Sequence, residues 1–345
     1  MKARYKQYIL KFKQASGTSR GILKTKETFF IQLSKEDKIG IGECGLFRGL
    51  SADDVSNYEE KLQWTCDHIN LPKEELLNEL IEFPSIQFGL EQAFLSLKSD
   101  DKFKLFPSDF TSGKAKININ GLVWMGTEQF MKKQIEEKLQ AGFTTIKLKI
   151  GAIDFKTELN LLKAIRKDFS AKEITLRVDA NGGFTPDEAL EKLSYLSDLE
   201  LHSIEQPIKV NQWEKMAELC EKSPLDIALD EELIGVFYKE KKAALLKAIK
   251  PQYIILKPSL VGGIQGSNEW ISLADKQNIG WWITSALESN IGLNAIAQYT
   301  YGLQTIIPQG LGTGSLFSNN INAPLRVKKG HLWYDLDLNW DEVKF

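Results

Sequence analysis

The sequence is poor in the residues that cross-link a small domain or bind soft metals. Its 345 residues include only three cysteines, Cys44, Cys66 and Cys220, and only three histidines. The cysteines have no paired spacing and an odd total, so the sequence supports neither a disulfide framework nor a thiolate metal site. This pattern predicts a protein of the reducing cytoplasm.

Long apolar runs and an excess of one charge are also missing. No stretch reaches the length needed to span a bilayer, and the first residues mix lysines with apolar side chains, unlike a secretory signal. The 44 basic and 46 acidic residues leave a formal charge of −2. We therefore expect neither nucleic acid nor a membrane as a partner, while a homo-oligomer stays open.

From about residue 117 onward, short apolar strands alternate with helical patterns. This alternation is typical of βαβ units around a parallel sheet, and eight such strands favour a closed barrel over an open sheet. The sequence thus predicts an α/β fold with a (β/α) TIM-like barrel. The expected strands are Ile117–Val123, Thr145–Ile150, Ile174–Ala180, His202–Gln206, Asp226–Asp230, Tyr253–Lys257, Gly280–Ser285 and Ile306–Leu311.

One expected barrel helix has a clear beginning. Thr185, Pro186 and Glu188 supply a capping hydroxyl, a proline at the first helical position and a carboxylate at the third. The leucines that follow at three-residue intervals predict its buried stripe, which comprises Leu190, Leu193, Leu196 and Leu199.

The first part of the chain lacks this alternation. Two β-like runs, Tyr5–Phe12 and Thr28–Leu33, precede a glycine-rich loop at 40–49 and a group of helices. We expect an α+β capping domain over residues 1–113, joined by the tail 324–345, and a barrel domain over residues 114–323.

The expected strands end in charged residues, and active sites of such barrels lie at these carboxyl ends. Any one strand-end carboxylate is ordinarily a helix cap or a solvated loop residue, but three at equivalent positions of consecutive strands are hard to attribute to coincidence. With no histidine or cysteine among them, they offer only oxygen ligands and favour Mg²⁺ over zinc. The strand-end residues are Lys147, Lys149, Asp179, Glu205, Asp230 and Lys257.

Lys149 and Lys257 flank the acids on both sides. A free lysine, with a pKa of about 10.4, is a poor base at neutral pH, but a divalent cation and a second lysine both favour its neutral form. The pattern predicts removal of a proton next to a substrate carboxylate, with the metal stabilising the enediolate. The alternative is that the lysines only form ion pairs with the acids.

These residues resemble those of the enolase superfamily, and within it the muconate-lactonising-enzyme subgroup. The Lys-x-Lys of Lys147 to Lys149, the three acids and Lys257 follow the subgroup's order, and the resemblance extends over essentially the whole chain, with a barrel of the enolase type. It implies that Lys149 is the base, that Lys257 is a cation facing the other side of the intermediate, and that Lys147 assists Lys149 and contacts the substrate carboxylate.

The last two strands indicate which members of the subgroup the chain resembles most. The segment 285–289 resembles the Ser-x-Leu-Glu-Ser of o-succinylbenzoate synthases, and Gly312–Ser315 lacks the Asp-x-Asp of dipeptide epimerases. This implies a hydro-lyase of menaquinone biosynthesis that dehydrates 2-succinyl-6-hydroxy-2,4-cyclohexadiene-1-carboxylate. An N-acylamino-acid racemase, a muconate cycloisomerase and, from another class, a non-catalytic barrel that binds a metal or carboxylate remain alternatives.

The remaining expectations concern the small-molecule carboxylate substrate. Glycines on the eighth strand would let the backbone approach it. In the loop 42–49, Arg48 is the candidate for meeting the succinyl carboxylate, although a turn arginine is more often only solvated. The expected substrate contacts are Lys147, Asn181, Ser285, Glu288, Gly312, Gly314 and Arg48.

Overall fold

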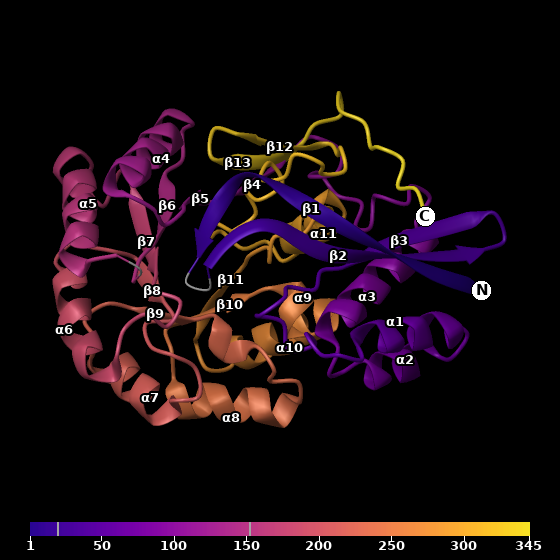
Figure 1. The fold of residues 1–345 in the computed structure, drawn as a ribbon, viewed down its shortest axis with the longest axis horizontal. Helices are drawn as coiled ribbons and strands as arrows, with labels where there is room; N and C mark the ends of the chain where they lie inside the picture. Colours follow the sequence, from indigo (N-terminus) through magenta and orange to yellow (C-terminus); the bar gives the residue numbers. More distant parts are fainter. Residues whose placement is uncertain (19–20, 152) are drawn as a thin grey trace.

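The structure, a computed structural model, describes residues 1–18, 21–151 and 153–345. Its N-terminal part is an antiparallel sheet with the order β1-β2-β3, against which three helices are grouped (Figure 1). The expected runs Tyr5–Phe12 and Thr28–Leu33 lie inside its first two strands. The elements of this part are β1 (Lys2–Thr18), β2 (Gly21–Lys35), β3 (Lys38–Cys44), α1 (Tyr58–Asp67), α2 (Lys73–Glu79) and α3 (Pro84–Lys98).

The second part is a curled parallel sheet with the order β11-β10-β9-β8-β7-β6-β5, and helices α4 to α8 form an arc outside it (Figure 1). The expected α/β barrel architecture is confirmed. Its strands are β5 (Gly121–Val123), β6 (Thr145–Lys149), β7 (Thr175–Asp179), β8 (Ser203–Glu205), β9 (Ile227–Leu229), β10 (Tyr253–Leu256) and β11 (Gly280–Ile283). Its helices are α4 (Glu128–Gln140), α5 (Phe155–Asp168), α6 (Pro186–Ser197), α7 (Trp213–Lys222), η1 (Glu231–Leu233), α8 (Lys239–Ile249), α9 (Pro258–Val261), α10 (Gly263–Asp275) and α11 (Asn290–Gly302).

The eighth expected strand is present only as two bridges that close the ring. Gln309 pairs with Ile119 and Gly310 with Thr284, both in parallel. A Cβ at Gly310 would lie 2.1 Å from the Thr284 hydroxyl oxygen, so this approach needs glycine. The predicted beginning of the strand was wrong, because Ile306 is 87% exposed.

The first expected strand is also divided. Residues 117–123 were predicted as one strand, but β4 (Lys116–Asn118) pairs antiparallel with the tail, in a sheet of order β12-β13-β4, and only β5 joins the parallel sheet. The tail strands are β12 (Leu325–Lys328) and β13 (His331–Tyr334). Beyond them, the Trp340 ring stacks on Phe103 at 4.0 Å between centroids, next to the N-terminal sheet. The division at residue 113 stays a prediction.

Local signals in the helices were mostly reliable. At α6, Thr185 and Glu188 form the expected capping box, and Pro186 is the first helical residue. The expected stripe is correct at its last three leucines, but Leu190 is 37% exposed and Ala189 is buried in its place. The buried face of α6 therefore begins one residue earlier than the leucine spacing suggested.

The glycine-rich segment at 40–49 begins as a strand, not as a loop. A Cβ at Gly42 would lie 1.9 Å from the carbonyl oxygen of Gly89, and a Cβ at Gly40 would lie 2.1 Å from that of Ala93. The glycines of β3 therefore let α3 pack directly on the strand backbone.

Two buried glutamates of the N-terminal part bind the amino ends of barrel helices. Glu43, on β3, accepts hydrogen bonds from the backbone N–H groups of Ser289 and Gly292, at 2.9 and 2.8 Å, at the start of α11. Glu91, on α3, accepts from residues 264 and 265 at the start of α10. Unpaired N–H groups and the helix dipole favour a carboxylate at such ends, so these contacts fasten the two parts together.

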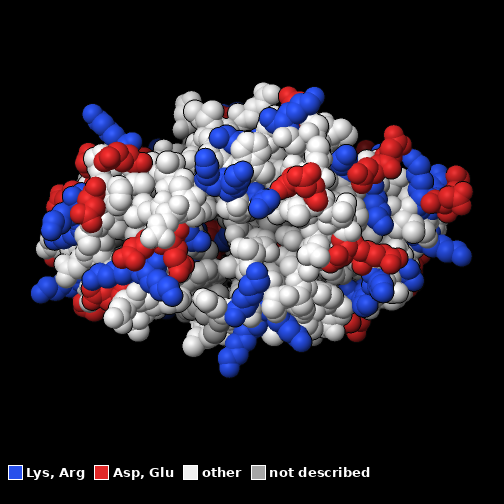
Figure 2. Space-filling model, turned by 90° about the horizontal axis from the view of Figure 1, so that it is seen from above, with Lys and Arg blue, Asp and Glu red and all other residues white. Residues whose placement is uncertain are grey.

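Charged side chains of both signs are interspersed over the face seen in Figure 2. This agrees with the nearly balanced composition and with the absence of a basic field on that face. Among the helices that the structure describes, none combines the length and the apolar character that a bilayer crossing requires.

Replacing Glu43 should loosen the junction between the two parts. Glu43→Ala removes a buried acceptor and leaves N–H donors unpaired, so we expect the free energy of unfolding to fall by about 3 kcal/mol. Urea denaturation measures this. Glu75→Gln, at an exposed position of α2, is the control, and an equal stability of the two variants would contradict the role of Glu43.

Glu91 should contribute a pH dependence to stability. Burial raises the pKa of Glu91 from 4.5 to about 7, although its backbone hydrogen bonds act in the opposite direction. The folded chain then holds this proton more tightly than the unfolded chain, so stability falls as pH rises from 4.5 to about 7. In denaturation series across this window, Glu91→Gln should show a shallower fall than wild type; parallel curves would refute the assignment.

Candidate active site

The strand register brings the predicted residues to one level of the barrel. Lys149 on β6 pairs with Asp179 on β7, which in turn pairs with Glu205 on β8. Residues in register on neighbouring parallel strands point to the same side of the sheet. The buried Arg177, two residues before Asp179, lies deeper on this side, with its guanidinium 4.1 Å from the centroid of the Trp282 ring.

Asp179, Glu205 and Asp230 form a compact acidic triad. One carboxylate oxygen of each lies within 4.8 Å of the others, and the three residues are at most 2% exposed. The buried Oε1 of Glu205 has no hydrogen-bond partner among the described residues. Three converging carboxylates, one with an unused oxygen, fit a divalent cation with oxygen ligands.

The three predicted lysines compensate the charge of this triad. Lys147 Nζ lies 2.5 Å from Glu205 and 3.1 Å from Asp179, and Lys149 Nζ lies 2.9 Å from Asp179. Lys257 Nζ lies 2.5 Å from Asp230. The ion pairs considered as an alternative therefore exist, but all three lysines also line one cavity together with Asp179. Because this cavity is open to a ligand, pairing alone does not account for them.

Burial and the three lysines act in opposite directions on the acids of the triad. Burial raises the pKa of Glu205 to about 8, with help from Asp179 and Asp230 and against the effect of Lys147. Burial also opposes the charge of Asp179, but Lys149 and Lys147 hold its pKa below the usual range. Burial thus acts against the charged forms of Asp179 and Glu205, and a divalent ion would favour these forms.

Asn181 contacts the predicted base. Its Oδ1 accepts a hydrogen bond from Lys149 Nζ at 2.7 Å, and its Nδ2 donates to Glu231 at 2.8 Å. Asn181 therefore orients Lys149, and its role as a substrate contact stays a prediction. Glu231 was missed by the sequence reasoning, although its place directly after Asp230 was a signal.

The seventh and eighth strands contribute unequally to the cavity. Ser285 and Gly312 belong to its described lining, as expected. Glu288 is fully buried behind it, and its two oxygens accept from the hydroxyls of Ser259 and Ser285 at 2.5 Å each. Gly314 is not part of this lining, because it packs against α11, where a Cβ would lie 2.6 Å from an amide oxygen. Direct substrate contact by Glu288 or Gly314 thus has no support in this arrangement.

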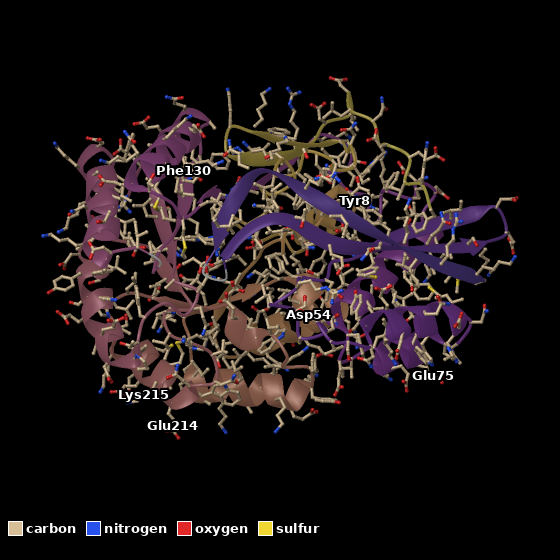
Figure 3. The ribbon with its side chains drawn as sticks, in the orientation of Figure 1. Tyr8, Asp54, Glu75, Phe130, Glu214 and Lys215 are labelled. Atoms are coloured by element: carbon tan, nitrogen blue, oxygen red, sulfur yellow. The ribbon has the colours of Figure 1, made fainter. Side chains whose placement is uncertain are left out.

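Arg48 also lies outside the described cavity lining, and its contact with the succinyl carboxylate stays a prediction. Its guanidinium is held by Glu27 at 2.5 Å and by Asp54 at 2.7 Å, and its side chain is 46% exposed. Asp54 is labelled in Figure 3. This position fits the alternative of a surface arginine better, because the Arg48 guanidinium already has two carboxylate partners.

The residues on either side of Arg48 do contribute to the cavity. Phe47 and Leu50 line it from the N-terminal part, and Leu287 and Leu316 line it from the barrel part. Sequence reasoning missed this apolar wall, since isolated apolar residues in loops give no periodic signal. A cavity with a charged floor and an apolar wall suits a carboxylate with a hydrocarbon body.

The comparisons with known proteins agree with this geometry. Residues 130–335 match the family described as Enolase C-terminal domain-like, which is more than half of the chain. The chain belongs to the enolase superfamily, as the strand-end motifs indicated.

Individual relatives show which members of this superfamily the chain is similar to. The chain is 45% identical to an o-succinylbenzoate synthase from Desulfotalea psychrophila, an alignment that covers 96% of this chain and 98% of the relative. The crystal structure of MenC from the same organism has a TM-score of 0.86 and 42% identity, and it covers 96% of this chain and 99% of that one. The muconate lactonizing enzyme from Pseudomonas fluorescens, at 21% identity, 98% and 96% coverage and a TM-score of 0.80, shares the fold.

Metal binding can be tested without any assay of activity. A ligand that binds only the folded state raises its stability, by about 2.7 kcal/mol at a concentration of 100 times Kd. We expect MgCl₂ to raise the melting temperature of wild type, and EDTA to reverse the rise. Glu205→Gln should lose the response, whereas Glu75→Gln should keep it. An undiminished response in Glu205→Gln would exclude Glu205 as a ligand.

Proposed function

We propose that this chain is an o-succinylbenzoate synthase, a hydro-lyase of menaquinone biosynthesis. The reaction removes water from 2-succinyl-6-hydroxy-2,4-cyclohexadiene-1-carboxylate and yields 2-succinylbenzoate. The chain is 45% identical to the o-succinylbenzoate synthase from Desulfotalea psychrophila over nearly the full length of both chains, and this identity supports the activity. The racemase, the muconate cycloisomerase and the non-catalytic barrel have no comparable support.

One observation of the site carries the proposal. Lys149 extends from β6 and Lys257 follows β10, so two lysine side chains reach one cavity from strands on different sides of the acidic triad. A barrel that only bound a carboxylate would not need opposed lysines. An enzyme that forms a planar enediolate needs a base on one face and a positive charge near it.

In the proposed mechanism, Lys149 acts twice. Its neutral Nζ takes the proton from the ring carbon that bears the carboxylate, and the C–H electron pair moves into an enediolate. The ring then expels the hydroxide from the neighbouring carbon, and Lys149 returns its proton to that oxygen. The C–O bond breaks, an aromatic double bond forms, and water leaves from the same face.

The other charged groups stabilise this intermediate. Lys257 supplies positive charge on the opposite side, and Lys147 binds the substrate carboxylate next to Lys149. We infer that Asp179, Glu205 and Asp230 hold Mg²⁺, which when bound neutralises charge developing on the substrate carboxylate. Asn181 keeps Lys149 at the ring by its hydrogen bond of 2.7 Å.

Location and partners complete the proposal. We infer a cytoplasmic protein, in agreement with three cysteines that are free thiols. The partner is a small dicarboxylate substrate, and an assembly of several copies of the chain remains a prediction from the sequence.

Removal of the proposed base should abolish turnover. Aromatisation of the diene, followed by ultraviolet absorbance with Mg²⁺ present, should slow by about 10²- to 10⁴-fold or more in Lys149→Ala. The exposed Lys133→Ala is the control for the loss of a lysine. A wild type that leaves the diene unchanged would contradict the function, and a fully active Lys149→Ala would contradict the assignment of the base.

A further inference from the structure

Asn181 lies between the predicted base and a further carboxylate, that of Glu231. Its Oδ1 accepts a hydrogen bond from Lys149 Nζ at 2.7 Å, and its Nδ2 donates to Oε1 of Glu231 at 2.8 Å. Glu231 is the first residue of η1, which follows β9, whereas Lys149 ends β6. Side chains from three strand-end segments therefore form one chain of hydrogen bonds that ends at the base.

The backbone places both Asn181 and Glu231 in defined positions. Asn181 has a φ of 44°, a left-handed conformation that asparagine adopts more readily than most residues. The turn η1 is held by Gln206, whose side-chain oxygen accepts from the N–H groups of Asp230 and Glu232 at 3.3 Å each. The contact between Asn181 and Glu231 thus joins two segments whose local conformations are already fixed.

The contacts of Lys149 determine which of its protons faces a ligand. A protonated lysine has three N–H groups, and two of them point to Asn181 Oδ1 at 2.7 Å and to Asp179 Oδ2 at 2.9 Å. The third direction remains for the cavity that Lys149 lines. In the neutral amine, a lone pair takes the place of this third proton and faces the cavity, as long as both acceptors keep their N–H groups.

The neutral amine does not by itself keep the Asn181 amide in this orientation. An ammonium group only donates and so selects the amide oxygen, but a neutral amine can also accept a hydrogen bond through its lone pair. A rotated amide would offer its N–H to that lone pair, in competition with the substrate proton. It would also turn its oxygen toward the carboxylate of Glu231, where two acceptors would meet. Glu231 therefore opposes the rotation at the step at which Lys149 is neutral.

We propose that Glu231 is a positioning residue for the base. It holds the Asn181 amide in one orientation, so that the lone pair of neutral Lys149 faces the substrate. Glu231 acts only through Asn181, and neither residue belongs to the acidic triad, so binding of a cation there does not require this contact to break. This inference rests on the proposed function.

A double-mutant cycle tests this role. Diene turnover with Mg²⁺ is measured in wild type, Glu231→Leu, Asn181→Gly and the double variant, since glycine removes the amide and tolerates the φ of 44°. We expect Glu231→Leu to lower kcat about 10- to 100-fold, with a smaller change in KM. In the Asn181→Gly background, Glu231→Leu should cause no further loss, because its effect passes through the amide. Effects that multiply in the double variant would overturn the proposal.

Two further variants separate positioning from folding. Glu231→Gln keeps an oxygen that accepts from the Asn181 amide, so it should retain most of the kcat that Glu231→Leu loses. Glu232→Leu removes the other buried carboxylate of the turn, which accepts from Asn211 and Gln206 at 2.9 and 3.0 Å, and it should lower the melting temperature more than kcat. A Glu231→Gln as slow as Glu231→Leu, or an equal loss of kcat in Glu232→Leu, would show the proposal to be wrong.

The outcomes also separate this inference from the proposed function. Turnover by wild type with an unchanged kcat in Glu231→Leu would overturn the role of Glu231 alone. The melting temperature of Glu231→Leu should still rise with MgCl₂ as in wild type, and a lost rise would mean that the substitution acts through the neighbouring Asp230 instead. If wild type fails to convert the diene, the proposed function is wrong and the role of Glu231 in it falls as well.

Discussion

Three carboxylates buried at the ends of neighbouring strands are the constraint around which this molecule is organised. The negative charges of this triad, Asp179, Glu205 and Asp230, repel one another because the site is buried. Three lysines at the same level of the barrel form ion pairs with them. Among the described residues, Oε1 of Glu205 still has no hydrogen-bond partner. A divalent ion would release the lysines from their carboxylates, and the released groups are those that the reaction needs.

Buried charged groups also hold the N-terminal part to the barrel part. Glu43 and Glu91 are buried at the junction and are stabilised by the N–H groups of barrel helices. The strand β1 also contacts the barrel segment near Phe317, and the hydroxyl of Tyr8, labelled in Figure 3, donates to the carbonyl of Asn319. Polar contacts therefore hold the N-terminal part against the barrel part, and Phe47 and Leu50 line the cavity from the N-terminal part.

Most of the catalytic floor could be predicted from the sequence, because strand alternation is strictly local. Two residues per repeat place Lys147 with Lys149, and the equivalent positions of Asp179 and Glu205 follow from counting along parallel strands. The same reasoning failed for Ile306 and Leu190, whose exposure depends on how neighbouring segments end. It did not foresee the ion pairs of Arg48 with Glu27 and Asp54, because no spacing within the loop indicates them.

A structure determined with Mg²⁺ and 2-succinylbenzoate would test the central claim most directly. We predict one metal ion about 2.0–2.1 Å from an oxygen of each of Asp179, Glu205 and Asp230. Lys149 and Lys257 should then face opposite sides of the aromatic ring, next to its carboxylate. A metal bound elsewhere, or a product ring with both lysines on one face, would contradict this description of the site.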